Sequence, residues 1–482
     1  MSGIISAIHF TISQGINQYE KVKNIAVMKK FRRFCFGGRQ RRYDMSRKKG
    51  GTVKTLGAAI LAASSAVGKK EKEGPLGDLF DFSDPTDRFG QKTWERSESE
   101  MQRIVFSGAA GKLGIGEEDI VYLVLPYVRS AREGVLRLGA LLEQYGTYES
   151  NGIAFNDENE VWWLETIGGH HWIAKRVPDD AYVVMPNQLG IDQFDLEDAL
   201  GAKKNHLCSA DLDDFIENNH LDLSWNGVLN PRDAFGSHDD SDHVYNTPRA
   251  WFMLRYLNPH SKKWDGPNAD YTPRSDDLPW CMVPEKKITP EDVKYVLSSH
   301  YQGTLYDPYG SSQSDQKGAF RSIGINRNDF MALIQMRPDQ PEDSRVLEWI
   351  AFASNAFNVM VPFYANVTTT PAYLSNTTGA VSTDNFYWNS RMIAAMADAA
   401  YSKSVFHIER YQLAAASAGH ANINTYDAKL RREQDASARA ALREQANEAM
   451  ADTIRGLAAD TLDKVLYELS CQMKNCYSRS DA

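Results

Sequence analysis

Cysteine is scarce and long apolar runs are absent, and each of these absences excludes a class of protein. Five of the 482 residues are cysteine, and no two of them form a Cys-x-x-Cys pair. A fold held together by disulfides is therefore not expected, and the sparse cysteines favour a reducing compartment, the cytoplasm. No stretch reaches the roughly 18–20 apolar residues of a membrane-spanning helix, so we expect no membrane partner.

An excess of positive charge is missing too. The chain carries 54 Lys and Arg against 63 Asp and Glu, a formal net charge of −9, which argues against nucleic acid as a partner. The stretch 108–116, GAAGKLGIG, lacks the Gly-Lys-Ser/Thr ending of a phosphate-binding loop. Aromatic residues are plentiful, with 10 Trp and 22 Tyr, and they suggest pockets in one large core or two ordinary ones.

Residues 1–112 differ from the rest of the chain. Between Lys21 and Lys54 there are thirteen basic residues and one acidic residue, Asp44, which predicts a solvated segment rather than a core. The Ala- and Ser-rich stretch 55–68 looks like the apolar part of an export signal, but it begins far from Met1. A poorly structured segment is therefore the preferred interpretation.

The pattern becomes regular from Ile115 onward. Two helices are predicted over 116–128 and 130–145, the second with Ser130 as its cap and Gly146 as its stop. Short β-rich runs separated by turn residues follow, at 151–155, 160–168, 171–177 and 181–187. This order predicts an antiparallel meander of four strands.

Two histidine-containing stretches invite a metal interpretation. His170 and His171 are neighbours on a predicted strand, where successive side chains point to opposite faces, so both can ligate one ion only if the backbone turns there. The stretch SHDDSDH, residues 237–243, reads as a solvated polar loop that would need further ligands from elsewhere. We therefore predict no metal and no cofactor, with a metal-dependent hydrolase kept as an alternative.

The remaining chain mixes helix and sheet. Thr289 and Pro290 begin a helix, residues 320–338 predict a hairpin around 326–329, and residues 348–367 predict one or two strands. An amphipathic helix is expected over residues 426–477, packed on the body of the protein or on another subunit. Helix and sheet blocks in this order predict an α+β protein rather than a Rossmann alternation.

Several long blocks resemble a known family. The segments 115–192, 230–259, 296–310 and 376–398 are similar to the bacterial cysteine dipeptidases of the dipeptidase A type. These are N-terminal nucleophile hydrolases related to penicillin acylase and bile-salt hydrolase. The resemblance implies a four-layer αββα sandwich, to which this chain adds a helical C-terminal extension. It also implies amide hydrolysis by a cysteine that begins the mature chain and uses its own α-amino group as base.

The resemblance also implies site residues. Asn187, in VVMPNQLGID, matches the amide that contacts the oxyanion, and Arg249, in NTPRAW, matches the arginine kept near the nucleophile. Ordinary alternatives are that Asn187 caps the next turn and that Arg249 pairs with Asp233 or Asp242. We also name three substrate-binding candidates, which are Trp163, His170 and Tyr301; packing roles are the alternative for each. Trp162 is a further candidate for the same pocket.

The sequence departs from the family at its beginning. The family's Cys-Thr-Thr block is absent from residues 1–112, and Cys35 is the only cysteine before the matching region, so Cys35 is the candidate nucleophile. Cys208 and Cys281 are expected to be structural. Three explanations of residues 1–112 are open. This segment is a genuine extension that replaced the catalytic strand, a translation in another reading frame, or a diverged propeptide.

These observations predict a three-part chain, with an atypical head at 1–112, a dipeptidase-like core at 113–424 and a helical segment at 425–482. The predicted function is hydrolysis of dipeptides and short peptides with broad specificity through a cysteine thiolate. The alternative is an inactive homologue that binds peptides or has a structural role. Both a monomer and a homo-oligomer are open.

Overall fold

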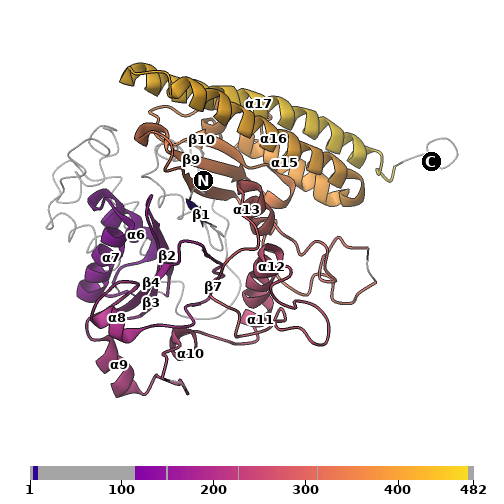
Figure 1. Ribbon diagram of the computed structural model, residues 1–482. Coiled ribbons are helices and arrows are strands. Elements are labelled where there is room, and N and C mark those ends of the chain that lie inside the picture. The colour runs from indigo at the N-terminus through magenta and orange to yellow at the C-terminus, as the bar shows by residue number, and fades with distance from the viewer. Residues whose placement is uncertain (1–3, 9–113, 148–149, 226, 312, 476–482) are drawn as a thin grey trace, which may run out of the picture. The chain divides into compact units, whose positions relative to one another are not determined.

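The computed structural model describes residues 4–8, 114–147, 150–225, 227–311 and 313–475 (Figure 1). Of the described residues, 4–8, Val177–Asp192 and those from Gly236 onward form a larger unit, and those within 114–176 and Gln193–Phe235 form a smaller unit. Both units combine helices with antiparallel sheets, so the α+β class is confirmed. Among the described residues, no helix combines the length and apolar character that crossing a membrane requires.

The smaller unit is built on an antiparallel sheet with two helices on one face (Figure 1). The sheet order is β2 (Gly152–Asn156), β3 (Val161–Gly168), β4 (His171–Val177) and β6 (His206–Cys208). The helices are α6 (Glu117–Val124) and α7 (Ala131–Tyr145). Trp162 and Leu164 of β3 and Trp172 of β4 pack against Leu138 of α7, because alternate strand residues face the same side.

Helix α7 begins and ends where the sequence predicts. The Ser130 side chain accepts a hydrogen bond from the backbone N–H of Glu133, and Gly146 terminates the helix with φ of +70°. These are local signals, a capping hydroxyl and a glycine in the left-handed region, and they need no tertiary context. Thr289 likewise caps α13 (Pro290–Leu297) through a capping box with Asp292.

The larger unit contains a second antiparallel sheet, in the order β1 (Ile4–Ile8), β8 (Phe330–Met336), β9 (Val346–Phe352) and β10 (Val361–Tyr364). Three helices cover one of its faces, α15 (Phe386–Ala399), α16 (Tyr401–Leu430) and α17 (Ala436–Ser470) (Figure 1). Phe352 and Phe363 of the sheet pack with Ile393, Ile408 and Ile454 of these helices in one buried cluster. The other described elements are α8 (Leu196–Leu200), α9 (Leu212–Asn219), α10 (Pro231–Phe235), α11 (Asp242–Tyr245), α12 (Thr247–Leu257), α14 (Ala372–Ser375), β5 (Tyr182–Val183), β7 (Cys281–Met282) and three 3-10 turns at Leu125–Tyr127, Glu342–Ser344 and Asn355–Phe357.

Three predictions about elements are corrected. The run at 181–187 does not join the meander, because β5 pairs with β7 while β4 pairs with β6. Residues 320–338 contain a single strand, β8, rather than a hairpin. The segment before β8 is a turn in which Asn328 Nδ2 donates to the Ile323 carbonyl. The C-terminal helix starts earlier than residue 426 and is interrupted at residues 431–435, giving α16 and α17.

Candidate functional site

A hydrogen bond joins Asn187 and Arg249 within the larger unit. Asn187 lies in the segment after β5, and Arg249 lies in the first turn of α12. Pro248 fits at the start of this helix, because the first helical residues donate no intrahelical hydrogen bond. Arg249 Nη2 donates to Asn187 Oδ1 at 2.9 Å. These two predicted site residues are therefore brought together in the structure.

The Arg249 guanidinium is buried among neutral oxygens. It is 4% exposed and also donates to the Tyr245 carbonyl and to Asn246 Oδ1. Burial, and to a lesser extent the positive charge of nearby Arg321, together lower the pKa of Arg249 to about 10. Because a pKa of about 10 is well above neutrality, the guanidinium stays charged at pH 7.

The contact with Arg249 fixes the orientation of the Asn187 amide. A guanidinium has only donors, so the oxygen of the amide must face it and the Nδ2 group must point elsewhere. Asn187 is exposed, whereas its partner is buried. The arrangement thus presents an oriented amide N–H donor at the protein surface, next to a buried positive charge.

Asn246 connects this pair to the stretch SHDDSDH. Its Oδ1 accepts from Arg249, and its Nδ2 donates to Asp242 Oδ1. Asp242 is 5% exposed and also accepts a hydrogen bond from the Ser237 hydroxyl. The direct Arg249–Asp242 ion pair considered from the sequence is therefore replaced by a bridge through an amide, and Asp242 acts as a structural acceptor.

Tyr301 lies in the same unit but is fully buried. It adopts φ of +66°, its ring contacts Phe252, and its hydroxyl donates to the Arg321 carbonyl at 2.8 Å. Contact between Tyr301 and substrate stays a prediction, and the geometry gives this residue a second role as a support for Arg321.

Trp163 and His170 belong to the smaller unit. Trp163 is half-buried on β3, and its Nε1 donates to Glu165 Oε1 at 3.0 Å. His170 is exposed in the turn after β3, where its Nδ1 lies 2.8 Å from the Glu143 carbonyl at the end of α7. Gly168 and Gly169, with φ of +116° and +57°, form this turn. Substrate binding by either side chain stays a prediction.

The two adjacent histidines diverge. His170 contacts α7, whereas His171 stacks on Phe215 of α9 at 3.9 Å between ring centroids and lies 3.5 Å from Asp211. In the larger unit, His238 Nδ1 and His243 Nε2 both approach one carboxylate oxygen, Asp276 Oδ1, at 3.5 and 2.8 Å. Within the described ranges, no group of three or more His, Cys, Asp or Glu residues could hold a metal ion.

The described cysteines differ in burial. Cys208 is buried on β6, and burial raises the pKa of its thiol to about 12, so it is protonated and unreactive at neutral pH. Cys281 is half-buried on β7, and Cys471 is exposed after α17. Cys35, the predicted nucleophile, lies outside the described residues.

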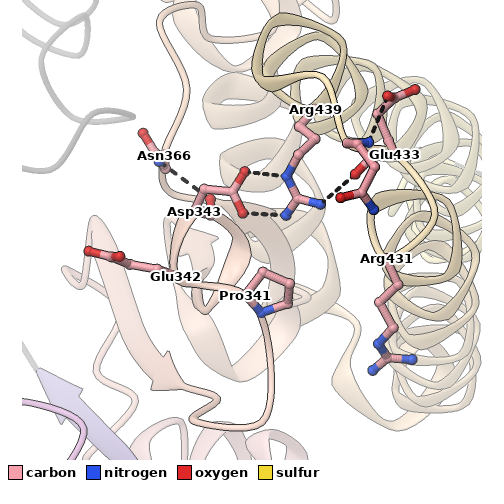
Figure 2. Close-up of a pocket in the computed structure, with 8 residues that line it drawn as sticks. Pro341, Glu342, Asp343, Asn366, Arg431, Glu433 and Arg439 are labelled. Atoms are coloured by element: carbon pink, nitrogen blue, oxygen red, sulfur yellow. Dashed lines mark hydrogen bonds and ion pairs between the residues drawn. The ribbon is translucent and has the colours of Figure 1, made fainter.

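A polar hollow of about 800 Å³ lies elsewhere in the larger unit, between the Glu342–Ser344 turn and the junction of α16 and α17 (Figure 2). The Arg439 guanidinium points at Asp343 (Figure 2). Asp343 also accepts a hydrogen bond from Arg443 Nη1 at 2.6 Å. Its lining contains no Cys, Ser, Thr or His, and neither Asn187 nor Arg249 borders it. Its central carboxylate is paired with two arginines, so we assign it no chemistry.

Sequence reasoning missed Asn246 and Arg321. Asn246 stands three positions before Arg249 in NTPRAW, so the helix-start context offered a weak signal for it. Arg321 stands in a stretch that was predicted to form a hairpin, and no local pattern marks it as close to Arg249.

Known proteins with dipeptidase names are similar to this sequence over most of its length. The sequence model of Peptidase family C69 matches residues 100–414. A relative from Bifidobacterium longum (strain NCC 2705), named Dipeptidase, is 52% identical over 408 residues, covering 76% of this chain and 76% of the relative. Probable dipeptidase A from Streptococcus pyogenes serotype M18 (strain MGAS8232) is 52% identical over 370 residues, covering 76% and 75%. Probable dipeptidase B from Lactococcus lactis subsp. lactis (strain IL1403) is 42% identical over 372 residues, with the same coverage.

A model of Stage V sporulation protein AD also matches a short segment, residues 52–126, most of which lies outside the described residues. The match to the first family covers well over half of the chain, and the relatives share both high identity and most of their length with it. The chain therefore belongs to Peptidase family C69.

Proposed function

We propose that this chain hydrolyses dipeptides and short peptides, with broad side-chain tolerance, through a cysteine thiolate. Two observations support the substrate class and the chemistry. Its relatives are named dipeptidases, and an exposed amide held by a buried arginine is a suitable donor for the oxyanion of amide hydrolysis. The Asn187–Arg249 contact is the observation that carries the proposal.

The proposed nucleophile is Cys35 as the first residue of a processed chain. Its thiol proton passes to the α-amino group, and Sγ attacks the scissile carbonyl carbon. The C–N bond then breaks, the leaving amine takes the proton, and water hydrolyses the thioester. An α-amine of pKa ~7.7–8.0 and a thiol of pKa ~8.5 are closely matched for this transfer.

Asn187 and Arg249 have distinct proposed roles. Asn187 Nδ2 donates to the oxyanion, because the contact with Arg249 leaves this group facing away from the guanidinium. Arg249 is a positioning residue for the amide, and its buried charge favours the thiolate form of a nearby cysteine. Trp163, His170 and Tyr301 remain our candidates for substrate contact.

The finer architecture is also proposed. Each unit carries an antiparallel sheet with helices on one face, and an αββα sandwich would stack two such layers with the helices outward. We keep the proposed organisation into a head at 1–112, a core at 113–424 and a helical segment at 425–482, and we propose the cytoplasm as the location from the sparse cysteines.

The test is dipeptide turnover by the purified full chain, with and without a thiol alkylator and a chelator. We expect the alkylator to abolish turnover and the chelator to leave it unchanged. Intact mass should show a chain that begins at Cys35, with the alkyl group on that residue. Peptide binding without turnover would indicate the inactive homologue, and loss of turnover with chelator, restored by Zn²⁺, would indicate the metal-dependent alternative.

Asn187→Ala tests the observation that carries the proposal. Removal of one oxyanion donor should lower kcat by about 100- to 1,000-fold with little change in KM. Asn219→Ala, which removes an exposed amide from the end of α9, is the matched control and should keep full activity. Equal kcat values for the two variants would contradict the role of Asn187.

A further inference from the structure

Arg321 lies in a cluster of positive charges that has no acidic partner. Burial lowers the pKa of Arg321, and nearby Arg327 lowers it further, while Arg321 in turn lowers the pKa of Arg249. Among the described residues, no carboxylate lies within ion-pair distance of Arg249 or Arg321. Adjacent like charges repel, so this cluster favours a bound anion.

The structure holds Arg321 in place from both sides. Its backbone N–H donates to the Val244 carbonyl at 3.1 Å, and its own carbonyl accepts from the Tyr301 hydroxyl at 2.8 Å. Its guanidinium lies over the Tyr245 ring, 5.8 Å from the centroid. A side chain fixed at its base and stacked on a ring loses little freedom when it binds a ligand.

One edge of the Arg321 guanidinium is without a partner. Nε and Nη2 are shielded from solvent and make no hydrogen bond, although the side chain as a whole is only half-buried and so borders solvent. A buried donor without a partner destabilises the protein until a ligand or water accepts its hydrogen bond. Nε–H and the outer N–H of Nη2 are parallel and lie on one edge, the spacing that matches the two oxygens of a carboxylate.

We propose that Arg321 binds the C-terminal carboxylate of the peptide substrate through its Nε and Nη2 edge. This inference rests on the proposed peptidase function and names a specificity residue for it. Arg249 contacts Asn187 and also donates to the carbonyl of Tyr245, the residue whose ring lies under the Arg321 guanidinium, so a carboxylate at Arg321 would lie close to the oxyanion donor. In a dipeptide the scissile carbonyl is one residue from the carboxylate, about 3.8 Å along the chain, so this anchor would select dipeptides over longer chains.

The experiment compares one apolar dipeptide with the same dipeptide as its C-terminal amide, on the full chain and on Arg321→Gln. The wild-type protein should prefer the free acid by about 100-fold in kcat/KM, mainly through KM, because the amide cannot accept two charge-assisted hydrogen bonds. Arg321→Gln should lose that preference, with turnover of the amide changed by less than about threefold. Arg321→Lys should keep only part of the preference for the free acid, because lysine has the positive charge but not the two parallel N–H donors.

Arg410→Gln is the matched control. Arg410 also stacks on an aromatic ring, Phe406 at 3.9 Å, but lies on α16 outside the cluster, and its variant should keep the full preference. Melting curves of all variants report whether they fold. Equal kcat/KM for acid and amide in the wild-type protein, or an equal loss for both substrates in Arg321→Gln, would overturn the assignment.

A binding measurement separates this inference from the proposed function. If the wild-type protein hydrolyses neither substrate, the proposed function fails. Calorimetry with a reduced-amide dipeptide analogue and with its C-terminal amide then tests by itself whether Arg321 binds a carboxylate. Acid binding about 100-fold tighter than amide binding, lost in Arg321→Gln, would uphold Arg321 as a carboxylate site. Equal binding of the two analogues would refute it.

Discussion

Glu348 is an acid with no partner in the interior of the larger unit. It lies on β9, is fully buried, and neither carboxylate oxygen makes a hydrogen bond. Burial raises the pKa of Glu348 from 4.5 to about 8, because an unpaired carboxylate is poorly solvated inside a protein. The side chain is therefore the neutral acid at neutral pH, and keeping it protonated lowers the folding stability.

This cost makes stability depend on pH. Below pH 4.5 both the folded and the unfolded chain keep the proton, whereas at higher pH the unfolded chain releases it first. Protonated Glu348 therefore lets the chain keep its full folding stability below pH 4.5. That stability is lost as the pH rises from 4.5 through the folded pKa of about 8, by on the order of several kcal/mol in total. Glu348→Met should raise the free energy of unfolding at pH 8 and flatten its dependence over this window.

Chemical denaturation at several pH values measures this effect. Glu448→Met, at an exposed position of α17, is the control and should leave the pH dependence as it is in the wild-type protein. A Glu348→Met protein that keeps the wild-type slope between pH 4.5 and 8 would show that Glu348 is ionised in the folded chain.

The close packing of α7 on its sheet depends on a glycine in the middle of the helix, Gly139. A Cβ atom at Gly139 would overlap the indole ring of Trp172 on β4. Gly139→Ala should therefore destabilise the smaller unit by about 1–3 kcal/mol through overpacking, although alanine is the better helix former. Gly456→Ala on α17, where nothing lies within 4 Å, should instead stabilise by about 0.5–1 kcal/mol. Denaturant midpoints of both variants test the opposite signs, and equal shifts would show that helix propensity alone decides.

Element boundaries were predictable where the signal is local. The cap at Ser130, the stop at Gly146 and the capping box at Thr289 each depend on a few neighbouring residues, so the sequence contains all that is needed. Strand pairing depends on residues far away, which is why the run at 181–187 was placed in the wrong sheet. The prediction of a hairpin was wrong for a similar reason. The backbone N–H of Gly324 donates to the Ser299 carbonyl, a partner 25 positions away that the local pattern does not reveal.

The candidate site was predictable only in part. Asn187 and Arg249 are 62 positions apart and were found through family resemblance, since no local spacing joins a segment after a strand to the first turn of a helix. Arg321 was not predicted because its surroundings come from two segments distant in the sequence, one with Val244 and Arg249 and the other with Tyr301. A cluster of like charges without acids becomes visible only when the fold brings those segments together.

At the scale of the whole molecule, each unit has its own buried cluster, one under α7 and two around the sheet of β8 and β9. A core of this kind can support cooperative unfolding by itself. We therefore expect calorimetry of the full chain to resolve two unfolding transitions. Gly139→Ala should lower only the transition of the smaller unit, and at pH 8 Glu348→Met should raise only that of the larger unit. If both variants shift one common transition, the two units unfold as a single cooperative body and their separate cores do not act independently.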